Sequence, residues 1–192
     1  MLISGMLQIG VAWFYSHVLE YILHKHVLHD RKVSPSWFKF HFGEHHFASR
    51  RNHMIDSKYD RFFKNWWKDQ EVWGLAFLGV LHFPLWFIFP AAYCTLLACA
   101  VSYYLVHRSC HRDHEWARNY APWHYDHHLA PDQHKNWGVR LPMIDHLVGT
   151  REIWKGQRKE IVSHVLGKKG GLDTYAEARS RCFERPEHGE GD

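Results

Sequence analysis

The sequence contains few cysteines, and their spacing excludes the common cysteine-based sites. The four cysteines are Cys94, Cys99, Cys110 and Cys182, and no two of them form a Cys-x-x-Cys pair. Disulfide scaffolds and structural zinc sites both depend on several closely spaced cysteines. We therefore expect neither a disulfide framework nor a thiolate metal site.

Several familiar catalytic motifs are also missing. The chain has no Gly-x-x-x-x-Gly-Lys-Ser/Thr loop and no His-Glu-x-x-His motif, so the sequence does not support a phosphate loop or a metalloprotease. It also lacks the Glu-x-x-His arrangement that soluble carboxylate-bridged di-iron bundles use. Any metal site must therefore be built in another way.

Charge is absent from two long stretches of the chain. Glu20 is the only charged residue in positions 1–23, and positions 73–106 carry no charge at all. The first stretch is long enough to cross a bilayer. The second would measure roughly 50 Å as one helix, too long for a hydrocarbon core of about 30 Å, and Pro84 and Pro90 provide breaks. We predict one N-terminal span plus a transmembrane hairpin; the alternative is a buried hairpin of a soluble protein.

The basic residues support this topology. All 24 Lys and Arg residues lie in positions 25–68 and 108–185, which the predicted spans place on one side. The positive-inside rule makes that side cytoplasmic. We therefore expect an integral membrane protein of the bacterial inner membrane or endoplasmic reticulum, with no nucleic-acid partner. A membrane domain is predicted for residues 1–166 and a polar tail for 167–192.

Histidine is the residue in excess, with 19 in the chain. Ten of them form four clusters on the predicted cytoplasmic side. Residues three or four apart share one face of a helix, so their imidazoles can converge on iron, zinc, copper or nickel. The clusters are His24 with His29; His41, His45 and His46; His107 with His111; and His124, His127 and His128.

The first cluster has an awkward spacing. His24 and His29 are five residues apart, about 140° around an ideal helix, so they share a site only if the helix ends, bends or widens. Glu20 shares a face with His24 and is a candidate to orient it. His53 is a reserve candidate after the second cluster. A single histidine is most often a surface or core residue without a special role. Gathering ten of them without a bound ion is unfavourable, because of desolvation or mutual repulsion. Ten ligands are too many for one metal ion and suit two.

The order of the clusters resembles the fatty acid hydroxylase superfamily, which includes sterol desaturases and carotenoid hydroxylases. The boxes read His-x4-His, His-x3-His-His, then the hairpin, His-x3-His and His-x2-His-His. The residues before His24 and His107 are also similar, as are segments 136–139 and 145–150, which contain Asn136 and Asp145. The second box has three residues between His41 and His45, where the family usually has two.

The resemblance implies an all-α membrane bundle whose cytosolic cap holds two iron ions through these ten histidines, with zinc as a substitute in purified protein. Glu20, His53, Asn136 and Asp145 are expected to support the ligands. The implied activity is O2-dependent hydroxylation or desaturation of a C–H bond in a fatty acyl chain, sterol or carotenoid. The electrons would come from an external donor of ferredoxin or cytochrome b5 type. The competing hypothesis is a membrane protein that binds metal without catalysis.

Overall fold

The computed structural model describes residues 2–60 and 69–154, which form helices and no strands. Within this range the prediction of an all-α fold is confirmed. Residues Met1–Glu152 form one compact unit. The predicted domain boundary at residue 166 and the tail 167–192 lie outside the described residues.

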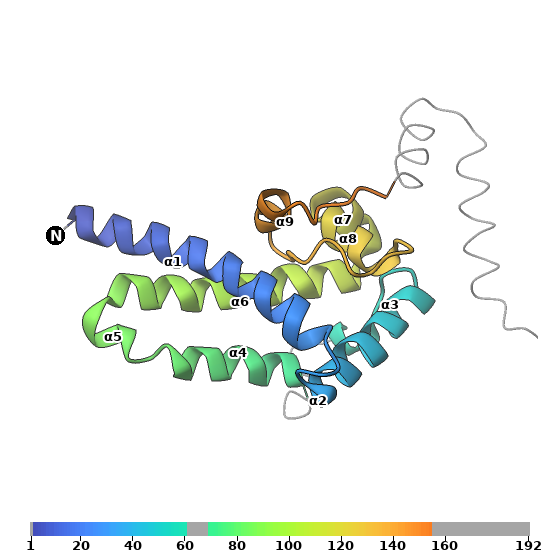
Figure 1. The fold of residues 1–192 in the computed structure, drawn as a ribbon, viewed down its shortest axis with the longest axis horizontal. Coiled ribbons are helices and arrows are strands. Elements are labelled where there is room, and N and C mark those ends of the chain that lie inside the picture. The colour runs from blue at the N-terminus through green and yellow to red at the C-terminus, as the bar shows by residue number, and fades with distance from the viewer. Residues whose placement is uncertain (1, 61–68, 155–192) are drawn as a thin grey trace, which may run out of the picture. The chain divides into compact units, whose positions relative to one another are not determined.

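Three helices run side by side along this unit (Figure 1). They are α1 (Leu2–Leu23), α4 (Gln70–Leu81) and α6 (Pro90–Arg112). The short α5 (Leu85–Ile88) joins α4 to α6 near the end where α1 begins. Pro84 is the N-cap of α5 and Pro90 is the first residue of α6, positions that proline tolerates because its missing N–H would have no helical partner. The predicted hairpin and its two proline breaks are therefore present.

One helix in the described part of the chain, α6, is long and apolar enough to cross a membrane, whereas α4 is apolar but shorter. Large apolar side chains are exposed on all three long helices, among them Leu7, Val80 and Val101. By length and composition the structure supports one membrane-crossing helix. The spans predicted from α1 and from the first arm of the hairpin remain predictions.

The remaining elements gather at the opposite end from α5 (Figure 1). Two of them are π-helical and one is a 3-10 helix, and the rest are short α-helices. They are η1 (His24–Leu28), α2 (Pro35–Phe38), η2 (Lys39–His46), α3 (Phe47–Arg51), η3 (Ser57–Tyr59), α7 (His114–Tyr120), α8 (Pro122–Leu129) and α9 (Met143–Val148).

The core of this end is polar. A small apolar cluster of Tyr21, Trp137 and Ile144 joins α1 to α9 and to the segment before α9. Most of the largest fully buried side chains, however, are histidines. Burying so many polar rings is unfavourable unless their nitrogens have partners, which makes the arrangement of those nitrogens the central feature of the fold.

Candidate metal centre

All ten histidines predicted as ligands are buried, none more than 6% exposed. Nine of them form two groups in which the candidate ligand atoms lie within 4.8 Å of one another. We call these the first and second groups. The first group is His24, His29, His41, His46 and His127, and the second is His45, His107, His111 and His128.

The tenth histidine, His124, lies beside the second group. Its Nε2 is 3.1 Å from Nε2 of His111, and its ring packs against those of His107 and His128. With His124 included, each group contains five histidines. The first group has two from the first box, two from the second and one from the fourth, whereas the second group has two from the third box, two from the fourth and one from the second.

Consecutive histidines divide between the groups. His46 belongs to the first group and His45 to the second, and likewise His127 and His128. Neighbouring residues on a helix point about 100° apart, so each pair contributes one ring to each group. The rings of His46 and His128 lie 4.1 Å apart between centroids. The two groups are therefore adjacent parts of one centre.

Two π-helical segments explain the spacing that an ideal α-helix does not allow. His24 opens η1 and His29 is its C-cap, while η2 contains both His41 and His46. The i→i+5 hydrogen bonds of a π-helix bring residues five apart onto one face. The helix therefore widens near His29, as the spacing of His24 and His29 requires. The second box, with three residues between His41 and His45 instead of two, also lies in a π-helix.

The separations between ring nitrogens match ligands of a shared ion. Two nitrogens bound to one metal at about 2.1 Å lie about 3.0 Å apart at a right angle and about 3.4 Å apart at a tetrahedral angle. The Nε2 atom of His46 is 3.1 Å from that of His29, 3.3 Å from that of His41 and 3.2 Å from that of His127. Nε2 of His24 is 3.0 Å from that of His41.

The outer nitrogens of these rings show that lone pairs face the centre. Nδ1 of His24 donates to the carbonyl oxygen of Trp137 at 2.6 Å, and Nδ1 of His127 donates to that of Lys135 at 2.7 Å. A carbonyl only accepts, so in the neutral form of each ring Nε2 is unprotonated. Lone pairs that point at one another in a buried space repel unless a cation lies between them.

The second group contains nitrogens with the same orientation. Nδ1 of His111 donates to the carbonyl oxygen of Met54 at 2.8 Å. Nε2 of His45, Nε2 of His107 and both ring nitrogens of His128 are buried and have no hydrogen-bond partner among the described residues. A metal ion would satisfy one nitrogen of each of these three rings, so the residues present fit the predicted di-metal site.

Carboxylates distinguish the second group from the first. Nδ1 of His45 lies 2.8 Å from Asp56, and Nδ1 of His107 lies 2.7 Å from Glu71. In the first group the corresponding partners of His24 and His127 are backbone carbonyls, and that of His46 is the amide oxygen of Gln133. A carboxylate raises the basicity of the imidazole that it accepts from. We therefore expect the second group to hold its ion more tightly.

The protonation states agree with this arrangement. Burial raises the pKa of Asp56. Burial also opposes ionisation of Glu71, but His107, Lys58 and the hydroxyl of Tyr59 together lower the pKa of this carboxyl to about 2. Burial lowers the pKa of His24 to about 4. Burial and repulsion between neighbouring imidazoles lower the pKa of the other ligands outside α6, which are His29, His41, His45, His46, His124, His127 and His128.

The structure gives hydrogen-bond partners for Glu20 and Asp145, two of the residues predicted to support the ligands. The carboxylate of Glu20 pairs with Arg140 at 2.7 Å and accepts from the backbone N–H of Val139, rather than from a ring nitrogen of His24. Asp145 accepts from the backbone of Trp137 and Gly138.

Asn136 and His53 were also predicted to support the ligands. The side chain of Asn136 accepts from Arg151 and from the backbone N–H of Glu152, and His53 is in neither group. Glu20, Asn136 and Asp145 therefore brace the loop whose carbonyls accept from His24 and His127. The same loop contains Gly138. A larger residue would not fit at this position, because its Cβ would collide with the carbonyl oxygen of Leu141.

Sequence reasoning missed the direct partners of the ligands. Asp56, Glu71 and Gln133 each contact a ligand nitrogen, yet none lies in a histidine box. The sequence signal for Glu71 is weak: it is the last charged residue before the uncharged stretch 73–106. Arg50 was also missed; it donates to the carbonyl oxygens of His128 and Ala130 and so holds the C-terminal end of α8.

An apolar cavity of about 310 Å³ reaches the centre between α1, α4 and α6. Most of its wall is aliphatic or aromatic, including Leu75, Leu78 and Leu96. At the end toward the histidines, it is lined by His24 and His41 of the first group and His107 of the second. A hydrophobic molecule in this cavity would therefore contact both halves of the centre.

Comparison with known proteins yields no relative. No protein-family model, no curated protein and no solved structure matches the chain. The assignment of a function therefore depends on the geometry of the site and on the resemblance of its histidine boxes.

Replacing Glu71 with glutamine should weaken metal binding at the second group by about tenfold to a hundredfold, the usual effect of losing such a hydrogen-bond partner. The change keeps the size of the side chain but removes the charge that accepts from His107. Competition with a chromophoric chelator would measure the affinity. Glu115→Gln, which alters an exposed carboxylate, is the control; equal affinities in both variants would contradict the assignment.

Proposed function

We propose that this protein is a membrane-bound, O2-dependent di-iron oxidoreductase that hydroxylates or desaturates a C–H bond of a lipid. The observation that carries the proposal is the combination of two groups of buried imidazoles, whose lone pairs face one another, with an apolar cavity that ends on three of those rings. Two iron ions bound there would supply the activation of O2. The resemblance to the fatty acid hydroxylase superfamily supports the same reaction class and the choice of iron.

The chain itself contributes orientation and exclusion of water. The carbonyls of Trp137 and Lys135 and the carboxylate of Glu71 fix the ring orientations of His24, His127 and His107. The apolar wall of the cavity favours a hydrocarbon over water. Because His24 and His107 line the same cavity end, the C–H bond that reacts would lie between the two groups.

The proposed location is a bilayer, with the histidine end at its cytoplasmic face. Leu7, Phe77, Val80, Phe87 and Val101 all expose more than half of their area. Large apolar side chains exposed on several neighbouring helices favour membrane contact. A lipid could then enter the cavity between α1, α4 and α6 from the hydrocarbon phase, while an external electron donor of ferredoxin or cytochrome b5 type approaches from the aqueous side.

The cavity favours an enzyme over a protein that only binds metal, since storage or transfer of an ion requires no hydrophobic chamber. Protein purified without oxygen is expected to contain two iron ions that are antiferromagnetically coupled and that react with O2. Mössbauer spectroscopy with elemental analysis would measure this. A single redox-silent metal per chain in protein expressed with ample iron would favour the alternative.

Lipid analysis tests the reaction itself. Cells expressing the protein should accumulate a hydroxylated or newly unsaturated lipid that cells carrying a metal-free variant lack. The comparison should cover hosts that make acyl lipids, sterols and carotenoids, because the resemblance leaves these substrate classes open. Identical lipid profiles in every host would refute the proposed activity.

A further inference from the structure

The polar side chains that line the cavity differ in whether they have a partner. Glu20 pairs with Arg140, and Lys58 lies 3.6 Å from Glu71. The hydroxyl of Tyr93 donates to the carbonyl oxygen of Gly79 at 3.3 Å. These groups stabilise one another and have little need of a polar ligand.

Tyr103 is the exception that carries an inference. It lines the cavity on α6, one helical turn before His107, and its ring lies 5.6 Å from that of His107 between centroids. No hydrogen bond joins its hydroxyl to any described residue, although a phenol in an apolar chamber usually has a partner. Tyr103 therefore shares the cavity with His24 and His41 of the first group and with His107 of the second.

We propose that Tyr103 is a specificity-determining residue that hydrogen-bonds an oxygen atom of the substrate close to the C–H bond that reacts. The inference depends on the proposed function for the identity of the reaction, but the binding preference does not. It narrows the substrate class to lipids with a hydroxyl or carbonyl oxygen near the reacting carbon, and it disfavours pure hydrocarbons.

The test measures binding without turnover. Zinc-loaded protein in detergent is titrated with 1-dodecanol and, separately, with dodecane. Emission of Trp37, which lines the cavity, reports occupancy, and Trp37→Phe protein supplies the background. The preference for the alcohol over the alkane is compared between wild type and Tyr103→Phe, so that unequal partition of the two ligands into micelles cancels.

We expect Tyr103→Phe to reduce the preference for the alcohol by about threefold to tenfold, the value of one neutral hydrogen bond, and to leave the affinity for dodecane unchanged. Tyr93→Phe removes a hydroxyl that already has a backbone partner and should keep the wild-type preference. The proposal is overturned if Tyr103→Phe keeps that preference, if both variants lose it equally, or if neither ligand binds. Absence of iron or of a lipid product would instead count against the proposed function alone.

Discussion

Alanine at both His127 and His128 should abolish formation of any oxidised lipid and remove most of the bound iron. The two residues are consecutive on α8, yet one belongs to the first group and the other to the second. Replacing these two neighbouring residues therefore removes one histidine from each group. Iron per chain would be measured by elemental analysis, and product by lipid profiling of the expressing cells.

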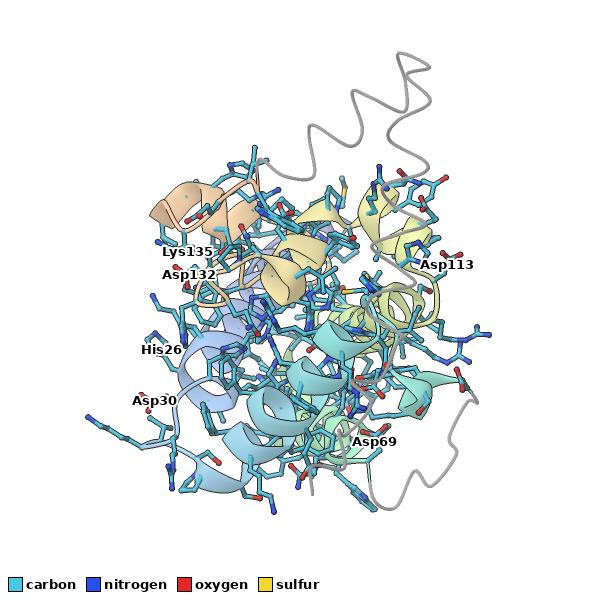
Figure 2. The ribbon with its side chains drawn as sticks, turned by 90° about the vertical axis from the view of Figure 1, so that its right-hand side faces the viewer. His26, Asp30, Asp69, Asp113, Asp132 and Lys135 are labelled. Carbon is cyan, nitrogen blue, oxygen red and sulfur yellow. The ribbon has the colours of Figure 1, made fainter. Side chains whose placement is uncertain are left out.

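The single variants separate the two halves. His127→Ala should retain iron at the second group and His128→Ala at the first, so each is expected to keep about half of the wild-type iron while losing the coupling between the ions. His26→Ala is the matched control, because His26 lies between two ligands but is exposed on the outer side of its turn (Figure 2). If the double variant kept two coupled ions, the assignment of His127 and His128 to separate groups would be wrong.

Sequence patterns predicted which histidines gather in the structure because the information is local. His107 and His111 are four apart on an uninterrupted helix, so their common face follows from helical geometry. His24 and His29 can share a site only if the helix widens locally, and no residue type predicts such widening. The structure shows that a π-helical turn is present there. The division of His45 and His46 between the groups was not predictable, because it depends on where distant helices pack.

The residues that orient the ligands could not be predicted for the same reason. Asp56 and Glu71 reach His45 and His107 from segments 11 and 36 residues away in the chain. Glu20 was assigned to His24 from helical spacing, but the loop at Val139 and Arg140 offers it a backbone donor and a cation. An ion pair stabilises a buried carboxylate far better than a neutral ring, so tertiary structure overrides the local pattern.

The membrane arrangement shows what composition can and cannot specify. The absence of charge in residues 73–106 predicted the hairpin, and Pro84 and Pro90 marked its breaks correctly. Composition also assigned both arms to a bilayer, whereas the structure gives one helix of sufficient length and an apolar first arm of 12 residues. Apolar composition predicts burial away from water, but the path of the backbone determines whether each arm crosses.

Removing the metals should make the stability of the protein depend steeply on pH. Burial holds the pKa of His24 at about 4 and lowers the pKa of the other ligands outside α6, while an unfolded histidine titrates near 6.5. Between these values the unfolded chain binds more protons than the folded one. The free energy of unfolding therefore falls as the pH decreases below about 6.5, by up to about 1.4 kcal/mol per pH unit for each such histidine.

The melting temperature of chelator-treated protein in detergent, measured from pH 7.5 down to pH 5, would reveal this slope. Protein with both ions bound should lose less stability over the upper part of the range, because a proton must displace a metal before an imidazole can be charged. A chelated protein whose melting temperature stayed constant across the range would show that the imidazoles are not held neutral by burial. In that case the lone pairs inferred at the centre would have to be solvated or protonated in the folded protein, and the requirement for a cation between them would disappear.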